Sequence, residues 1–145
     1  MRRILVFLLA VLLAASAGSM IQSLVNLQAI AALTGPIATA EQLSTLWFDL
    51  RHFMPVLAAI FLPIMLLSLV LSRIVLKRAT LGKVPAVFVI TALSTWAALL
   101  IINQLAPMPT LIALNRTLAG TLLLLSCCAL GAVFYHYFSR SRSVA

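Results

Sequence analysis

The chain has 145 residues, of which 64% are hydrophobic and 8% are charged, and its formal net charge at pH 7 is +8. A soluble domain carries roughly 25% charged residues, so this composition excludes an ordinary soluble fold and indicates a membrane protein. The positive charge is better explained by membrane topology than by nucleic acid, and we expect no nucleic-acid partner.

Four apolar stretches are long enough to cross a membrane. Each reaches about 20 residues, the length that a helix needs to span roughly 30 Å of hydrocarbon. Helices are expected because lipid offers the backbone no hydrogen-bond partners. The predicted fold is an all-α bundle of four antiparallel transmembrane helices, forming a single domain over residues 1–145. The predicted spans are residues 4–33, 53–72, 84–106 and 118–138.

The first stretch is longer than one crossing needs, so it is expected to tilt or to project beyond the membrane. It ends at Gly35 and Pro36, because glycine suits a left-handed helix cap and proline cannot continue the helix. Its start also resembles a secretory signal peptide, and cleavage after Ala17 would leave three spans. The apolar character continues well past Ala17, which favours an uncleaved helix.

The second half of the first stretch carries polar residues at spacings of three and four, which place them on one helix face. Polar side chains within a span usually face other helices or a wet cavity rather than lipid. Interhelical hydrogen bonding and a cavity lining both remain open for this face. Its members are Ser16, Ser19, Gln22, Ser23 and Asn26.

A short amphipathic helix is predicted at the membrane surface before the second span. Thr39 and Gln42 fit a capping box, with Thr39 as the N-cap. Apolar residues then recur at helical spacing, and Trp47 and Phe48 suit an aromatic belt.

The candidate catalytic residues are Asp49, Arg51 and His52, which lie in "TLWFDLRHFMP", residues 45–55. His52 is the natural proton-transfer group, because imidazole titrates near neutral pH. Asp49, one helical turn away, would orient it, and Arg51 would hold an anion. The alternative is that these are solvated groups at the membrane surface, where such pairs contribute little.

Further polar residues cluster at the same side of the membrane. The third span ends in Asn103 and Gln104, before Pro107 and Pro109. The fourth carries small residues such as Gly131 at spacings that permit close helix packing. The side chains predicted to line a pocket on this side are Asn26, Gln22, Asn103, Gln104 and Arg116.

The basic residues indicate the orientation of the chain. Cytoplasmic loops of membrane proteins collect lysine and arginine, so we expect both termini in the cytoplasm of a bacterial inner-membrane protein. Arg51 and Arg116 then lie outside, together with Glu41 and Asp49. The basic residues predicted inside are Arg2, Arg3, Arg73, Lys77, Arg78, Lys83, Arg140 and Arg142.

The sequence contains no motif of a metal or cofactor site. His52 and His136 are predicted on opposite sides of the membrane, and the adjacent Cys127 and Cys128 point in different directions on a helix. Phosphate-binding loops, dinucleotide turns, zinc-protease motifs and nucleophile elbows are all missing from the sequence. We therefore expect no metal and no cofactor, and the sequence leaves enzymatic activity open.

Four features follow one another along the chain: a small-residue-rich first span, "LWFDLRHFMP", "IINQLAPMP" and "LNRTLAG". In this layout the chain resembles the DUF1772, or anthrone-oxygenase-like, family of small four-span membrane proteins. It departs from the family's pattern at the end of the third span, where Asn103 precedes Pro107. The resemblance implies cofactor-independent oxidation of an anthrone-type substrate in some members, with His52, Asn103 and Arg116 as candidate residues.

The main functional prediction is a non-catalytic subunit that packs its helices against a membrane-protein partner or a second copy within the lipid bilayer. The first alternative is a membrane-embedded enzyme or binder for a lipophilic aromatic molecule, with its polar site at the outer face. The third choice is a small transporter, which would have to oligomerise because four spans are few for a transporter.

Overall fold

The structure is a computed structural model that describes residues 1–76, 82–105 and 113–140. Four of its helices are long and apolar enough to cross a membrane, which indicates a multi-pass membrane protein. A short 3₁₀ helix, η1, precedes the last of them. The helices are α1 (Arg2–Thr34), α2 (Thr39–Leu76), α3 (Lys83–Leu105), η1 (Ala113–Arg116) and α4 (Leu118–Arg140).

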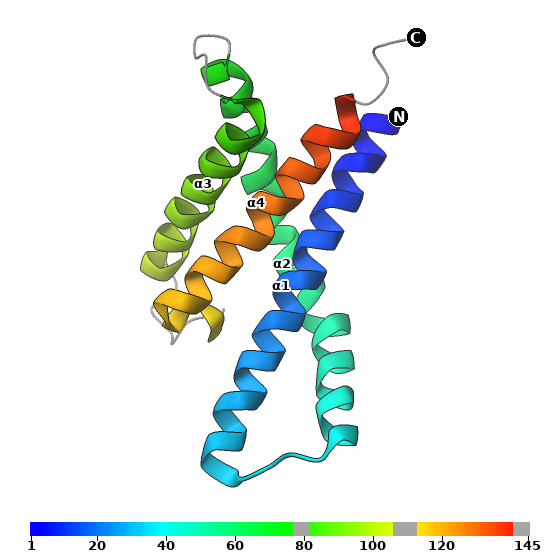
Figure 1. The fold of residues 1–145 in the computed structure, drawn as a ribbon, viewed down its shortest axis with the longest axis vertical. Helices are drawn as coiled ribbons and strands as arrows, with labels where there is room; N and C mark the ends of the chain where they lie inside the picture. Colours follow the sequence, from blue (N-terminus) through cyan, green and yellow to red (C-terminus); the bar gives the residue numbers. More distant parts are fainter. Residues whose placement is uncertain (77–81, 106–112, 141–145) are drawn as a thin grey trace.

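The four long helices form a ring in which each packs against two others. α1 contacts α2 and α4, and α3 contacts the same two helices from the other side. Both termini lie at the same end of the molecule (Figure 1), and the ring of Phe7 near the start of α1 meets that of Tyr135 near the end of α4 at 5.7 Å.

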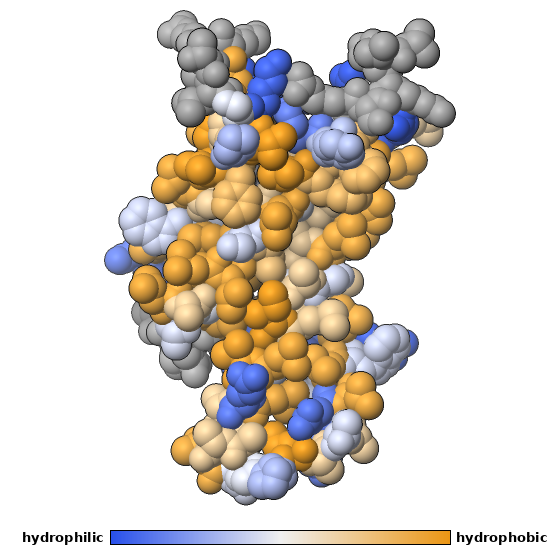
Figure 2. Space-filling view, in the orientation of Figure 1, coloured by the Kyte–Doolittle hydropathy of each residue, from blue (hydrophilic) through white to orange (hydrophobic). Residues whose placement is uncertain are grey.

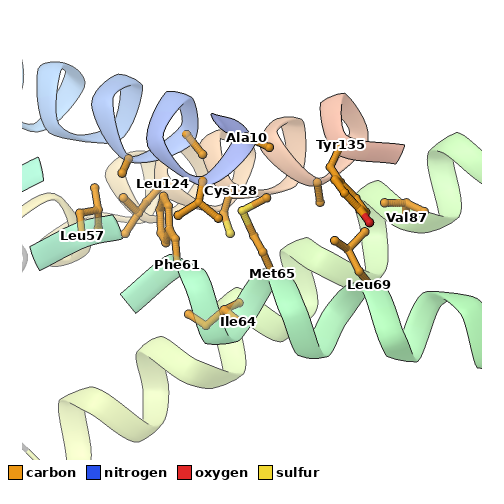
Figure 3. Close-up of a cluster of buried hydrophobic side chains, with 14 of the residues drawn as sticks. Ala10, Leu57, Phe61, Ile64, Met65, Leu69, Val87, Leu124, Cys128 and Tyr135 are labelled. Carbon is orange, nitrogen blue, oxygen red and sulfur yellow. The ribbon is translucent and has the colours of Figure 1, made fainter. Parts of the chain in front are cut away.

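Small residues let α1 approach α4 closely. A Cβ atom added at Gly131 would lie 2.8 Å from the Cβ of Ala14 and 3.1 Å from the carbonyl oxygen of Ala10. The small-residue packing expected for the fourth span is thus confirmed, and it takes place inside the chain. The larger core side chains fill the space between α1, α2 and α4 (Figure 3); they include Leu57, Phe61, Met65, Leu124 and Cys128.

Between α1 and α2, the predicted end of the first helix is present, but the capping box predicted at the start of the next helix is not. Gly35 has φ 93°, and its N–H donates to the carbonyl of Ala31 at 3.0 Å, so the predicted end of the first helix is confirmed. α2 begins at Thr39, but the capping box does not form. Gln42 instead donates its side-chain N–H to the carbonyl of Ile37 at 3.0 Å. Thr39 is thus the first residue of the helix rather than its N-cap, and a difference of one residue at a helix start is common.

α2 is one continuous helix that passes through Pro55 and Pro63. The short helix that the sequence predicts before the second span is therefore not a separate element. Proline is tolerated inside membrane helices where neighbouring groups satisfy the freed carbonyl. At 1.5 Å per residue, α2 is about 57 Å long and α1 about 50 Å, against about 35 Å for α3.

The extra length of α1 and α2 forms a hairpin that extends past the ends of α3 and α4 (Figure 1). We call residues 28–48 the hairpin arm, because no residue in this range is buried. The first stretch is thus longer than one crossing needs, as expected, and its extra length forms part of the hairpin arm. Figure 2 shows a wide apolar belt along the molecule and hydrophilic side chains gathered toward its two ends.

Ala17, after which the alternative interpretation placed a signal-peptide cleavage, lies within a packed helix. α1 continues through Ala17 without interruption, and Ala10 and Ala15 before it belong to the core. For Arg116 and Arg140 the structure describes the backbone but not the side chain. Several other residues used for the sequence predictions lie wholly outside the described part of the chain: Lys77, Arg78, Ala106, Pro107, Pro109 and Arg142.

Candidate functional site

The polar face of α1 meets α2 at Asp49. The hydroxyl of Ser23 donates to Oδ2 of Asp49 at 2.6 Å, and that of Ser19 donates to the Asp49 main-chain carbonyl at 3.3 Å. Ser23 also lies 2.9 Å from the carbonyl of Ser19, so its single proton is shared between two acceptors. Both serines are buried. The polar face therefore forms interhelical hydrogen bonds, the first of the two roles expected for it.

The other two candidate catalytic side chains face away from Asp49. The guanidinium carbon of Arg51 lies 5.2 Å from the centre of the Trp47 ring. His52 is exposed and stacks on Phe48, with ring centres 4.1 Å apart.

The proton positions follow from these contacts. Nδ1 of His52 lies 2.9 Å from the carbonyl of Phe48, and because a carbonyl only accepts, Nδ1 carries the proton. Asp49 and His52 do not pair, since each bonds to a different group. The three predicted catalytic residues thus share one helix segment without converging on one point.

Gln22 lies on the same face of α1 and has an unusual environment. Its side chain is only 7% exposed, and within the described ranges Oε1 is the buried side-chain atom without a hydrogen-bond partner. A buried acceptor without a donor costs about 1–3 kcal/mol. Asn26, one turn further along, is partly buried. Oε1 of Gln22 can therefore still accept a hydrogen bond from a donor that does not belong to the described side chains.

The remaining predicted pocket residues gather around η1. Asn115 donates to the side-chain oxygen of Asn103 at 3.2 Å, and Thr121 donates to that of Asn115 at 2.9 Å. These bonds join the end of α3 to the start of α4. Gln104 is exposed, and Arg116 lies in η1. α1 also packs against η1.

Metal-binding side chains do not cluster in the described residues. No group of three or more histidine, cysteine, aspartate or glutamate side chains there is close enough to hold a metal ion. Cys127 and Cys128 are both buried in α4 as free thiols.

A cavity of about 340 Å³ lies at the opposite end of the bundle, near both termini. The ends of α2 and α4 and the start of α3 form its walls. Its apolar side chains are Leu69, Leu76, Val87 and Tyr135, and its polar ones are Ser72, Arg73, Lys83, His136 and Ser139.

A second cavity, of about 180 Å³, adjoins the first. Leu69, Arg73 and Tyr135 line both cavities. The second one continues toward the start of α1, where Ile4 and Phe7 form part of its wall. Arg3 lines the second cavity too, so basic side chains line both cavities.

The sequence did not indicate this basic cavity. Arg73 and Lys83 were assigned to membrane topology, and nothing in their spacing places them around one space. Arg73 and Lys83 flank one short connection, but the end of α4 that completes the cavity is far from it in the chain. The one available signal is the cluster of aromatic residues and His136 near the end of the fourth span.

No protein-family model, curated protein or solved structure matches this chain.

Proposed function

We propose that this chain is a non-catalytic subunit of a membrane assembly and that it contacts its partner through the hairpin arm. The observation that carries the proposal is the apolar surface of the arm. Leu33 is 88% exposed and Leu43 63% exposed, and Trp47 and Phe48 are more than half exposed as well. Neither α3 nor α4 extends far enough to cover them (Figure 1).

The length of the helices explains why this surface needs a partner. Even the shorter helix α3 is long enough to cross about 30 Å of hydrocarbon. α1 and α2 exceed that by about 15 Å or more, so the end of the arm reaches the headgroup region or beyond. Large apolar side chains in that region are stabilised when another protein covers them.

The composition of the arm, and of the turn of α2 that follows it, supports a protein partner. Tryptophan, phenylalanine and arginine are enriched in the centres of protein interfaces, where they supply most of the binding energy. Trp47 with Arg51, and Phe48 with His52, form two preorganised ring contacts on the exposed side of α2. On this proposal the predicted catalytic residues Arg51 and His52 are contact residues.

The proposal includes an orientation. Arg2, Arg3, Arg73 and Lys83 lie at the end that holds both termini, whereas Glu41 and Asp49 lie toward the arm. The preference for lysine and arginine in the cytoplasm supports a bacterial inner-membrane protein with cytoplasmic termini. The arm would then meet its partner at the outer face.

Photo-crosslinking in native membranes tests the arm. A photoreactive amino acid at Leu43 should form a discrete adduct with a protein. The matched control is Leu93 on α3, which is 57% exposed and lies within a span. An adduct of twice the chain's mass identifies a second copy as the partner. If the probe at Leu43 yields no more protein adduct than the probe at Leu93, the arm is not the docking surface.

Gln22 favours a second candidate function, a membrane-embedded enzyme or binder of a lipophilic aromatic molecule. A ligand hydroxyl would supply the donor that Oε1 lacks. The resemblance to the anthrone-oxygenase-like family supports the same substrate class, with His52, Asn103 and Arg116 as its candidates. Purified protein would then retain an aromatic molecule that Gln22→Leu and His52→Ala lose, and its absence from the wild type would contradict this function.

A further inference from the structure

We propose that the basic cavity between α2, α3 and α4 binds the phosphate of an anionic phospholipid headgroup. Arg73 and Lys83 bring positive charge from two different helices to the same cavity. Ser72 and Ser139 also line it, and their hydroxyl groups donate to the main-chain carbonyls of Ser68 and His136. Basic pockets between the cytoplasmic ends of membrane helices are suited to anionic lipid headgroups.

The acidic side chains of the chain do not supply a counter-charge for Arg73 and Lys83, which are both exposed. The chain contains two acidic side chains, Glu41 and Asp49. Both lie on α2, the same continuous helix as Arg73. Since Asp49 precedes Arg73 by 24 positions, about 36 Å of helix separates them. Neither acid can therefore neutralise Arg73 or Lys83.

Tyr135 adds a hydroxyl group to the wall of the cavity. Its side chain is 9% exposed. Figure 3 shows the ring leaving α4 with its hydroxyl directed between Leu69 of α2 and Val87 of α3. Both of these residues line the cavity. A tyrosine hydroxyl at the wall of a basic cavity can donate to an anionic oxygen.

The adjoining second cavity favours a lipid over free phosphate. Its apolar lining includes Ile4, Phe7, Leu66 and Val70, Arg3 lines it as well, and Arg73 belongs to both cavities. Ile4, Leu66 and Val70 are also among the exposed apolar side chains, so this wall faces the lipid phase. A phosphate beside Arg73 would place the first part of an acyl chain along this apolar wall.

A general preference for basic residues in the cytoplasm does not account for this arrangement. That preference requires lysine and arginine on one side of the membrane, and any exposed position satisfies it. It does not require that cations of two different helices line one cavity.

Native mass spectrometry of the full-length protein tests the site. The purified chain is mixed with equal amounts of dioleoyl-phosphatidylglycerol and dioleoyl-phosphatidylcholine, and the bound lipids are counted. Each basic residue near an anionic lipid contributes about fivefold in affinity, so Arg73→Gln and Lys83→Gln should each lower the preference for phosphatidylglycerol about fivefold. Arg73→Lys retains the charge and should retain most of the preference.

Arg51→Gln is the matched control, because it removes the same charge at the other end of the bundle. It should leave the preference unchanged, and an equal loss there would overturn the proposal in favour of unspecific attraction. Tyr135→Phe should lower the preference without changing thermal unfolding, and an unchanged preference would remove the hydroxyl from the site. Displacement of the lipid by excess inorganic phosphate would show a site for free phosphate and overturn the lipid assignment.

Discussion

At the scale of single residues, the polar groups of α1 hold α1 and α2 together. The sequence predicts that Ser19 and Ser23 share an inward face, because helical spacing alone determines this. It does not predict their partner. Asp49 reaches Ser23 only because α2 continues as a helix through Pro55 and runs back along α1. Such contacts between distant segments cannot be derived from local spacing.

Ser23→Ala should lower the stability of the bundle. The variant loses the donor to Asp49 and leaves that carboxyl group without its interhelical bond. Interhelical hydrogen bonds in membranes contribute about 0.6 kcal/mol and at most about 1.7 kcal/mol, so a small decrease in the unfolding temperature is expected. Thermal unfolding in detergent, followed by circular dichroism, measures it.

Ser126→Ala is the control for this variant. The Ser126 hydroxyl bonds to the carbonyl of Leu122 in its own helix. Its loss should change the unfolding temperature less than Ser23→Ala does. Equal decreases for the two variants would mean that the Ser23–Asp49 bond contributes nothing specific.

At the scale of helices, the number and approximate positions of the spans could be predicted, because lipid imposes both length and apolar composition. The continuity of α2 could not, because Pro55 and the polar residues before it suggest a break. The small-residue pattern on the fourth span predicted close packing without identifying the neighbour. The structure shows that Ala10 and Ala14 of α1 occupy that position beside Gly131.

Gly131→Leu should therefore disrupt the bundle itself. The new side chain would collide with Ala14 and with the main chain at Ala10. Overpacking a tight interface costs about 1–3 kcal/mol, and a contact with main-chain atoms cannot relax easily. The yield of monodisperse protein in size-exclusion chromatography should decrease.

Ala97→Leu provides the comparison, since Ala97 is exposed on α3. This variant adds a side chain of the same size where it meets only lipid, and its yield should equal that of the wild type. A normal elution profile for Gly131→Leu would contradict the close contact between α1 and α4.

At the scale of the whole molecule, the two ends of the bundle carry different kinds of side chains. The arm presents apolar and aromatic side chains at one end, and the basic cavity lies at the other. The sequence predicts the charge difference between the ends, because it can be counted along the chain. The cavity could not be predicted, since it requires the ends of three helices to meet. The convergence expected for Asp49, Arg51 and His52 does not occur, because each of these side chains contacts a different group.

The central claim is that the chain works as a subunit through its arm. The most direct test is the mass of the complex extracted from native membranes in mild detergent, measured by native mass spectrometry. The account predicts a stoichiometric protein partner, or a second copy, in addition to the 15.6 kDa chain, and its loss when Leu43 and Trp47 are both replaced by serine. A chain that is recovered alone from intact membranes, with no protein bound to it, would contradict the account.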